Sequence, residues 1–453
     1  MNQLQPRIQP FAALIFNRDR AGRLEELIAP PYDLIDQSRR EQLYARSPNN
    51  IVRLELNREP DPYAAAAATL ARWIANGTLQ RTQPAIFLYT QTFELERQKF
   101  TRTGWVVRIR LEEFASGRIL PHERTFPKAR EDRLRLLAAT RANISSVFGL
   151  YPPGKKELEA LMAEVVTRPP ILEAADDLGI LNQVRLVDSL AEISLIQRAL
   201  EPARVLIADG HHRYETALEY RRRSSARSGI RPLAGSSEPK EPAPRNARDE
   251  WSRDEGGSAL LPEDYVMMTL VAFDDPGLVI LPTHRVVKLL GSEQLQAYDN
   301  LIREKFAVEE FDDTDAMFAA LQSRGRGYIG AAVKGRRLSL LHLRNQDYMS
   351  RALPQVHDEV RKLDVAVLHA VILNEILGIT AQLVRSGENI EYTIDGRAAL
   401  ASVVSGAAAG AFLLSPPTVY DVENVSNAGA TMPEKSTYFY PKLQTGLLIN
   451  PLD

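Results

Sequence analysis

Apolar and polar residues alternate along the chain with two periods, which predict helices and strands in mixed order. The helical period covers residues 62–76, 131–139, 155–166, 190–201, 211–223, 293–306, 314–323 and 363–377. Strand-like runs cover residues 85–93, 105–111, 146–151, 205–208, 265–273, 278–281, 327–333 and 338–343. The last part gives a strand at 389–394, a helix, a strand at 411–414, a helix and a final hairpin around 438–449. This order predicts an α/β or α+β fold with mixed sheets and flanking helices.

One stretch breaks the pattern. Residues 224–260 are rich in Ser, Pro, Gly, Arg and Glu and have almost no apolar periodicity, so we expect a flexible insertion there. A functional lid is the alternative. The insertion would separate an N-terminal α/β part, residues 1–223, from a C-terminal α/β part, residues 261–453.

The amino-acid composition argues against several classes of partner and excludes several kinds of catalytic chemistry. The 453 residues include 56 Lys and Arg against 58 Asp and Glu, a net charge of −2, which makes nucleic acid an unexpected partner. The absence of cysteine excludes disulfides, thiolate metal sites and cysteine nucleophiles. Neither a signal peptide nor a membrane-spanning run is visible, so we expect a cytoplasmic protein with no membrane partner. Catalysis would therefore fall to His, Asp, Glu, Arg and Lys.

The first candidate site is the turn Asp209-Gly210-His211-His212-Arg213. A buried-looking strand ends here, glycine allows a tight turn, and a helix begins whose free N–H groups favour a phosphate. The two histidines and the arginine would strengthen an anion site. Asp209, the one acidic side chain, could take a proton from a hydroxyl or hold Mg²⁺. The alternative is that Asp209 only caps the helix.

The second candidate site is a basic segment that begins at His122 and Glu123, which we consider as acid or base groups. Its phosphate-binding candidates are Arg124, Lys128, Arg133 and Arg141. The alternative is a solvated helix start with local ion pairs.

Three further groups are candidates for substrate binding, each with a purely structural alternative. They are Tyr32 and Asp33 after two prolines, His284 and Arg285 at a strand, and Lys435, Ser436 and Thr437 within the donor-rich stretch 433–442.

Motifs along nearly the whole chain resemble those of the domain-of-unknown-function-1015 family of bacteria and archaea. They include RIQPFAALIFN, IAPPYDLI, LPHERTFPKAREDRLRLLAATRANISSVFGLY, IADGHHRYETALEY, YVMMTLVAFDDPGLVILPTHRVV and MPEKSTYFYPKLQTGLLINPL. The insertion at 224–260 is longer than this resemblance leads us to expect. The family label implies no function.

A shorter resemblance does imply one. IADGHHR is similar to the D-G-H-H-R stretch of free serine kinases in the ParB/sulfiredoxin superfamily. It implies a ParB/sulfiredoxin-like core, with Asp209 as base or Mg²⁺ contact and residues 210–213 around phosphate. The separate catalytic glutamate of those kinases has no clear counterpart here, and Glu123 is chosen on local chemistry.

The leading hypothesis is a small-molecule phosphotransferase, such as a free serine kinase, that uses ATP or ADP with Mg²⁺ on an anionic or hydroxyl substrate. One alternative is a non-catalytic, nucleotide-binding regulatory protein of the ParB type. Another is a phosphate-ester hydrolase or lyase that uses His122, Glu123 and His211. The sequence leaves the oligomeric state open.

Overall fold

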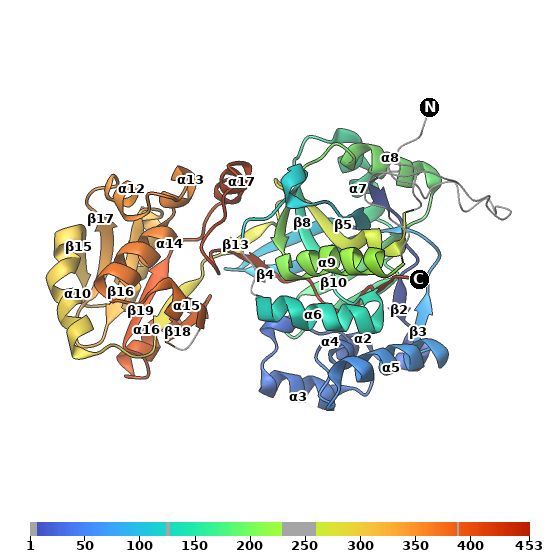
Figure 1. Cartoon of the computed structure of the whole chain (residues 1–453), viewed down its shortest axis with the longest axis horizontal. Coiled ribbons are helices and arrows are strands. Elements are labelled where there is room, and N and C mark those ends of the chain that lie inside the picture. The colour runs from blue at the N-terminus through green and yellow to red at the C-terminus, as the bar shows by residue number, and fades with distance from the viewer. Residues whose placement is uncertain (1–6, 124–126, 229–259, 387–388) are drawn as a thin grey trace. The chain divides into compact units, whose positions relative to one another are not determined.

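The chain folds into two compact units (Figure 1). A computed structural model describes residues 7–123, 127–228, 260–386 and 389–453. The first unit comprises the described parts of 1–120, 125–278 and 441–453, and the second those of 121–124 and 279–440. The chain thus leaves the first unit after residue 278 and returns to it at Pro441. Most of the predicted insertion lies outside the described residues.

The first unit is built on one mixed sheet. Its strand order is β6-β11-β8-β12-β5-β4-β10-β9, with β1 also paired to β5. The bounds are β1 Ile8–Gln9, β4 Ile86–Leu95, β5 Gln98–Arg110, β6 Ile119–Leu120, β8 Val147–Tyr151, β9 Leu172–Ala175, β10 Leu181–Val187, β11 Val205–Asp209 and β12 Tyr265–Ala272. The pairs β6–β11 and β8–β12 are parallel and the others antiparallel, which confirms a mixed α/β fold. The strands predicted at 85–93 and 105–111 correspond to β4 and β5, which form an antiparallel hairpin.

Helices cover one face of this sheet. They include α7 Lys156–Val166, α8 Leu190–Leu200 and α9 His211–Ser228, whereas α6 Pro127–Thr140 packs against α9. Alternate residues of the central strands, such as Leu88, Val107 and Met268, share a buried cluster with the apolar sides of α7, α8 and α9. The helix predicted over residues 211–223 is present as α9, and Tyr214 and Leu218 on its apolar side lie in this core.

Smaller elements complete the first unit. They are β2 Leu14–Phe16, α1 Arg18–Ala21, α2 Leu24–Leu27, η1 Tyr32–Leu34, α3 Gln37–Arg46, α4 Val52–Glu55, α5 Pro62–Ala75, β3 Leu79–Arg81, η2 Phe114–Ser116, β7 Ala142–Asn143, η4 Pro262–Asp264 and β21 Asn450–Pro451. Two short sheets, β2–β3 and β7–β21, tie the N- and C-terminal segments to this unit.

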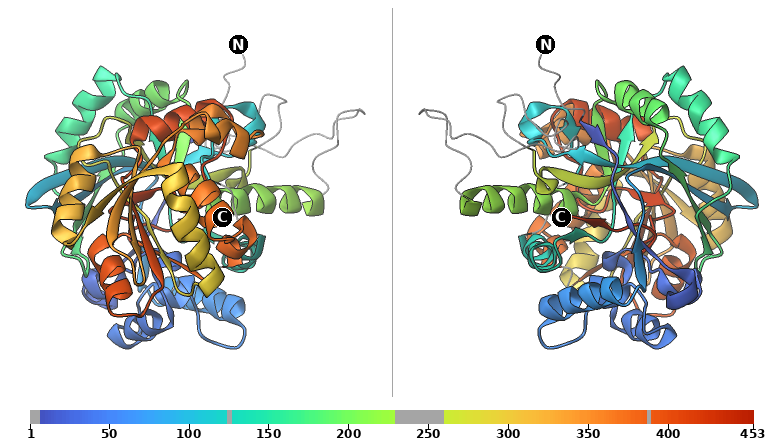
Figure 2. Two further views of the ribbon diagram at one scale, coloured as in Figure 1. Left: turned by 90° about the vertical axis from the view of Figure 1, so that its left-hand side faces the viewer. Right: turned by 90° about the vertical axis from the view of Figure 1, so that its right-hand side faces the viewer.

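The second unit contains a six-stranded antiparallel sheet in the order β15-β17-β16-β19-β14-β18. The strands are β14 His284–Val287, β15 Phe306–Phe311, β16 Tyr328–Val333, β17 Leu338–Leu343, β18 Ile390–Thr393 and β19 Gly410–Leu414, beside a ribbon of β13 Val279–Leu281 and β20 Tyr438–Tyr440. The helices are α10 Ser292–Lys305, α11 Thr314–Arg324, α12 Tyr348–Ala352, α13 Asp358–Arg361, α14 Asp364–Val367, α15 Ala381–Ser386, α16 Gly396–Val404 and α17 Val419–Asn427. Helices lie on both faces of the sheet, with α11 and α16 packed on one of them (Figure 2).

The helix predicted at 363–377 has two parts. After α14, residues Leu368–Ile376 form a π-helix, η5, whose wider turn the apolar pattern does not reveal.

The final hairpin predicted around 438–449 is wrong. Strand β20 pairs with β13 in the second unit, whereas β21 pairs with β7 in the first. Pro441 stands between them and has no N–H with which to continue a ladder. The polar groups that follow find partners in the first unit, where the Lys442 carbonyl accepts a hydrogen bond from Gln91.

In the described part of the chain, no helix is both long enough and apolar enough to cross a membrane.

Candidate functional site

The predicted turn at residues 209–213 joins the end of β11 to the start of α9. The register of β11 against β8 shifts between Ile207 and Asp209, which ends the regular pairing at the aspartate. Gly210 follows with φ +88°, and a Cβ there would lie 2.9–3.0 Å from the guanidinium of Arg213. The positive φ favours glycine at this position, and a larger residue would also displace the Arg213 guanidinium.

The Asp209 carboxylate accepts two charged hydrogen bonds. Arg213 Nη2 lies 2.7 Å from Oδ2, and Lys442 Nζ lies 2.6 Å from Oδ1. Burial by itself would raise the pKa of Asp209, but Lys442 and Arg213, with a smaller contribution from His211, hold that pKa well below its usual range. Asp209 is thus ionised, and its charge is shared by two cations.

Both cations are largely buried. Their side chains are 12% and 11% exposed for Arg213 and Lys442, respectively. Arg213 also donates to the Ser146 carbonyl, while its Nε is buried without a hydrogen-bond partner. Two cations meeting at the N-terminus of an 18-residue helix form an electropositive site with one carboxylate at its centre.

The two histidines occupy the first turn of α9. His211 is buried, at 6% exposed, and His212 is half-buried. The first hydrogen bond within the helix runs from the Tyr214 N–H to the Gly210 carbonyl. The backbone N–H groups of both histidines therefore stand before the regular hydrogen bonding of α9 begins.

Tyr32 and Arg133 belong to the same neighbourhood. The Arg133 guanidinium lies 4.3 Å above the Tyr32 ring, and Arg133 and Arg213 line one cavity of about 50 Å³. Burial, with the negative charge of Asp33, raises the pKa of Tyr32 to about 12 against the opposing charges of Arg213 and Arg133. The Tyr32 hydroxyl is therefore a protonated donor beside the site.

Arg133 itself is fully engaged. It donates to the Asp132 carboxylate at 2.6 and 2.9 Å and to the Glu55 carboxylate and carbonyl at 3.2 Å. Glu55 is 3% exposed, so this is a buried ion pair between α4 and α6. These contacts give Arg133 a structural role next to the site.

The donors around Asp209 do not fit a resident Mg²⁺. Both of its oxygens face cations, and the described residues contain no cluster of three His, Cys, Asp or Glu side chains that would hold a metal. We therefore assign no step to an ion held by Asp209.

Two predicted residues of the first unit have exposed side chains. Arg141 is exposed and donates to the Leu452 carbonyl at 3.1 Å, so it holds the C-terminal segment. Asp33 is exposed.

His122 and Glu123 belong to the second unit. His122 is completely buried, with Nε2 2.9 Å from Thr437 Oγ1 and its ring edge-to-face with Phe439. Glu123 Oε1 is buried and has no hydrogen-bond partner. The predicted Arg124 and the side chain of Lys128 lie outside the described residues.

The other candidates of the second unit make structural contacts. Ser436 is buried and donates to the Pro433 carbonyl. The Lys435 carbonyl accepts from Arg285, which is fully buried and lies 5.1 Å from the Tyr392 ring centre. His284 is 4% exposed and accepts the Leu414 N–H through Nδ1 at 3.2 Å.

Replacing His284 with asparagine is expected to make folding less sensitive to acid. Burial, aided by the charge of Arg285, lowers the pKa of His284 to about 4, below its unfolded value of 6.5. Because the folded state then binds fewer protons, the stability from this group is lost as the pH falls from 6.5 towards 4. From pH 7 to pH 5 that loss is about 2 kcal/mol. Asparagine can accept the same N–H but does not titrate.

Denaturant unfolding at the two pH values measures this difference. His357→Asn is the matched control, because His357 also accepts an N–H through Nδ1 but is exposed. An equal loss of stability in wild type and His284→Asn would contradict the prediction.

Lys442 and Glu55 are site residues that sequence reasoning missed. Lys442 stands in the donor-rich stretch 433–442, but nothing near it points to Asp209, 233 positions earlier. Glu55 lies in the four-residue helix α4 and meets Arg133 only through the fold. For Lys442 the one usable signal was a lysine beside the apolar run Tyr438–Tyr440, since such charges are buried only when paired.

The fold and the turn define a two-unit α/β protein with paired cations at a strand–glycine–helix junction. The chain belongs to the family described as "Protein of unknown function (DUF1015)", whose model matches residues 8–366. No curated protein sequence matches the chain.

Several solved structures align with most of the chain at low similarity. A free serine kinase in complex with AMP is 12% identical, covering 76% of this chain and 92% of that one, with a TM-score of 0.35. A variant of a free serine kinase in complex with ADP is 13% identical over the same shares, with a TM-score of 0.36. SbnI with a C-terminal truncation, from Staphylococcus aureus, is 11% identical, covering 77% and 87%, with a TM-score of 0.34.

Proposed function

We propose that this protein is a small-molecule phosphotransferase that moves a phosphoryl group between a nucleotide and a hydroxyl compound such as free serine. The observation that carries the proposal is the pair of cations, Arg213 and Lys442, on one carboxylate at the start of α9. Phosphoryl transfer requires mainly positioning and charge neutralisation, and this arrangement supplies both. The similarity of the D-G-H-H-R stretch to free serine kinases supports the same chemistry.

A phosphate would bind by exchange with Asp209. Its oxygens can accept from the Lys442 ammonium and from the Arg213 guanidinium at the start of α9. Each cation that turns to the phosphate weakens an ion pair that now keeps the pKa of Asp209 low. Phosphate binding would thus raise that pKa and release the carboxylate as a proton acceptor.

The transfer step follows from this exchange. The substrate hydroxyl oxygen attacks the terminal phosphorus, a new O–P bond forms, and the bond to the nucleotide's bridging oxygen breaks. The hydroxyl proton passes to Asp209, and the negative charge on the leaving phosphate is neutralised by Lys442 and Arg213. Tyr32, which keeps its proton, could donate to a phosphate oxygen.

The test is incubation of the full chain with Mg²⁺, ATP or ADP and a panel of hydroxyl amino acids, followed by phosphorus NMR. We expect turnover with at least one acceptor and a loss of about a hundredfold or more in Lys442→Met, which keeps length but removes the charge. The exposed Lys99 gives the control, Lys99→Met, which should retain wild-type turnover. Absence of turnover together with absence of nucleotide binding by calorimetry would refute the proposal.

One observation favours a second candidate, a nucleotide-binding protein without catalysis. A carboxylate that two cations keep ionised is a weak base unless the ligand displaces both. Calorimetric binding of ATP or ADP with no change in the phosphorus spectrum would select this alternative.

A further inference from the structure

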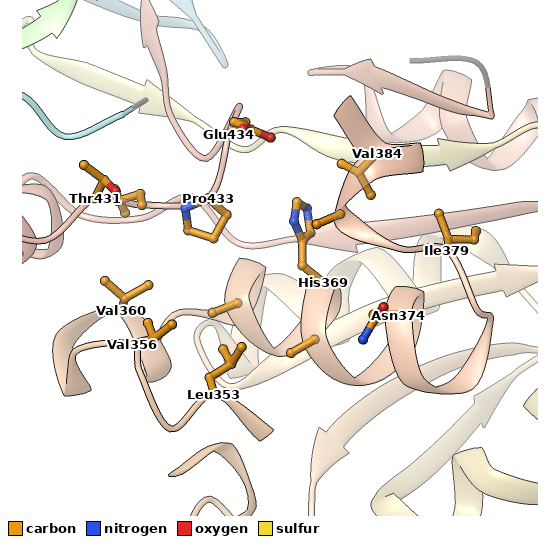
Figure 3. Close-up of a pocket in the computed structure, with 14 residues that line it drawn as sticks. Leu353, Val356, Val360, His369, Asn374, Ile379, Val384, Thr431, Pro433 and Glu434 are labelled. Atoms are coloured by element: carbon orange, nitrogen blue, oxygen red, sulfur yellow. The ribbon is translucent and has the colours of Figure 1, made fainter. Parts of the chain in front are cut away.

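The second unit contains a cavity of about 300 Å³ that the proposed phosphate chemistry does not use (Figure 3). Its walls are mainly aliphatic, with Leu353, Val356, Val360, Ile379 and Val384 among them. A cavity of this size and character is within the range of small-molecule sites, which are apolar with a few placed polar groups. Its aliphatic walls favour a ligand with an apolar body.

A polar group enters this cavity from the π-helix. Figure 3 shows the His369 ring directed away from η5 into the space between Pro433 and Val384. Asn374, from the same helix, also lines the cavity. π-Helical turns are uncommon and occur often at functional sites, because the wider turn redirects side chains.

The contacts of His369 fix which ring nitrogen carries the proton. Arg285 Nε lies 3.2 Å from His369 Nε2. An arginine Nε can only donate, so Nε2 of His369 must be the acceptor. The neutral imidazole therefore carries its hydrogen on Nδ1, which makes Nδ1–H a donor of fixed identity.

Arg285 is itself held rigidly. Its Nη atoms donate to the carbonyls of Thr283, Glu434 and Lys435, and the guanidinium is fully buried. Burial and the adjacent charge of Arg285 lower the pKa of His369 to about 3, so the ring stays neutral across the physiological range. The arginine thus acts as a positioning residue for the histidine.

We propose that this cavity binds an uncharged molecule with an apolar body and one carbonyl oxygen, which accepts a hydrogen bond from Nδ1–H of His369. The donor cannot become an acceptor without breaking the contact with Arg285, so it selects for an oxygen on the ligand. Glu434 is the one charged side chain among the described lining residues, and its negative charge opposes carboxylate or phosphate ligands. This site goes beyond the phosphate site at Asp209 and does not depend on it.

Three small probes separate the parts of this proposal: acetophenone, ethylbenzene, which lacks the oxygen, and benzoate, which adds a negative charge. Saturation-transfer NMR with the full chain gives their dissociation constants. We expect His369→Phe to weaken acetophenone about tenfold and to change ethylbenzene by less than about twofold. Benzoate should bind wild type at least about tenfold more weakly than acetophenone. Val360→Trp, which fills the cavity, should remove the binding of both neutral probes.

A second measurement does not need a variant. Nitrogen-15 NMR of the histidine-labelled wild-type protein should show His369 protonated on Nδ1 and unchanged between pH 7 and pH 5. The proposal is overturned if acetophenone does not bind, if His369→Phe affects both neutral probes equally, or if the Val360→Trp protein binds them unchanged. It is also overturned if the proton is on Nε2.

Discussion

Replacing Asp209 with asparagine is expected to destabilise the protein by about 3 kcal/mol and to abolish phosphoryl transfer. The substitution removes the carboxylate that pairs with both buried cations, Lys442 and Arg213. It also removes the proposed proton acceptor, a loss of at least about a hundredfold in rate. Denaturant unfolding and the phosphorus NMR assay measure the two effects.

The same variant should gain a new response to anions. With the carboxylate gone, inorganic phosphate can take its place between the cations, so phosphate should raise the unfolding midpoint of Asp209→Asn more than that of wild type. Asp177→Asn is the matched control. Asp177 pairs with Arg39 and Arg46, but on the surface, where the loss should stay below about 1 kcal/mol. Unchanged stability of Asp209→Asn would show that the carboxylate does not hold the two cations.

Replacing Arg133 with methionine is expected to cost about 3–5 kcal/mol of unfolding free energy. The change leaves the buried Glu55 carboxylate without its cation and removes the guanidinium from above the Tyr32 ring. Since Arg133 lines the same cavity as Arg213, nucleotide binding should weaken together with stability. Chemical denaturation and calorimetry measure both.

The control for this prediction lies two residues further along α6. Arg135 is 61% exposed and pairs with Glu131 one turn away, so Arg135→Met should change stability by less than about 0.5 kcal/mol. The double variant Glu55→Gln with Arg133→Met should recover part of the loss, because no buried charge remains unpaired. If the two single arginine variants unfold alike, the Glu55 pair contributes little.

Much of the fold follows from local pattern. The hairpin β4–β5, the helix α9 and the run from β11 through Gly210 lie where apolar periodicity and a glycine turn place them, because these depend on neighbouring residues. The hairpin expected around 438–449 depended on a partner strand, and the chain found two different partners on opposite sides of Pro441. Pairing between distant strands leaves no trace in a local period.

The candidate site likewise combines contacts between neighbouring residues, which the sequence can predict, with contacts between distant residues, which it cannot. Asp209, Gly210 and Arg213 stand in one short motif, so their meeting could be predicted. Lys442 lies 233 positions after its partner Asp209, and Arg133 lies 78 positions after its partner Glu55. Only the tertiary fold brings the members of each pair together. Local sequence equally could not show that the donors of Arg133 are already taken by Glu55 and Asp132.

The pairing of β13 with β20 brings together the two ends of the long segment that forms most of the second unit. Val279 lies directly opposite Tyr440, so the chain positions that flank the second unit are neighbours. A short linker from Leu278 to Pro441 would therefore close with little entropic cost and would still deliver Lys442 to Asp209. Residues 121–123, which belong to the second unit, would lose their surroundings. In modular terms, the second unit is a cassette within a host domain, and we expect that it can be exchanged without redesigning the proposed phosphate site at Asp209.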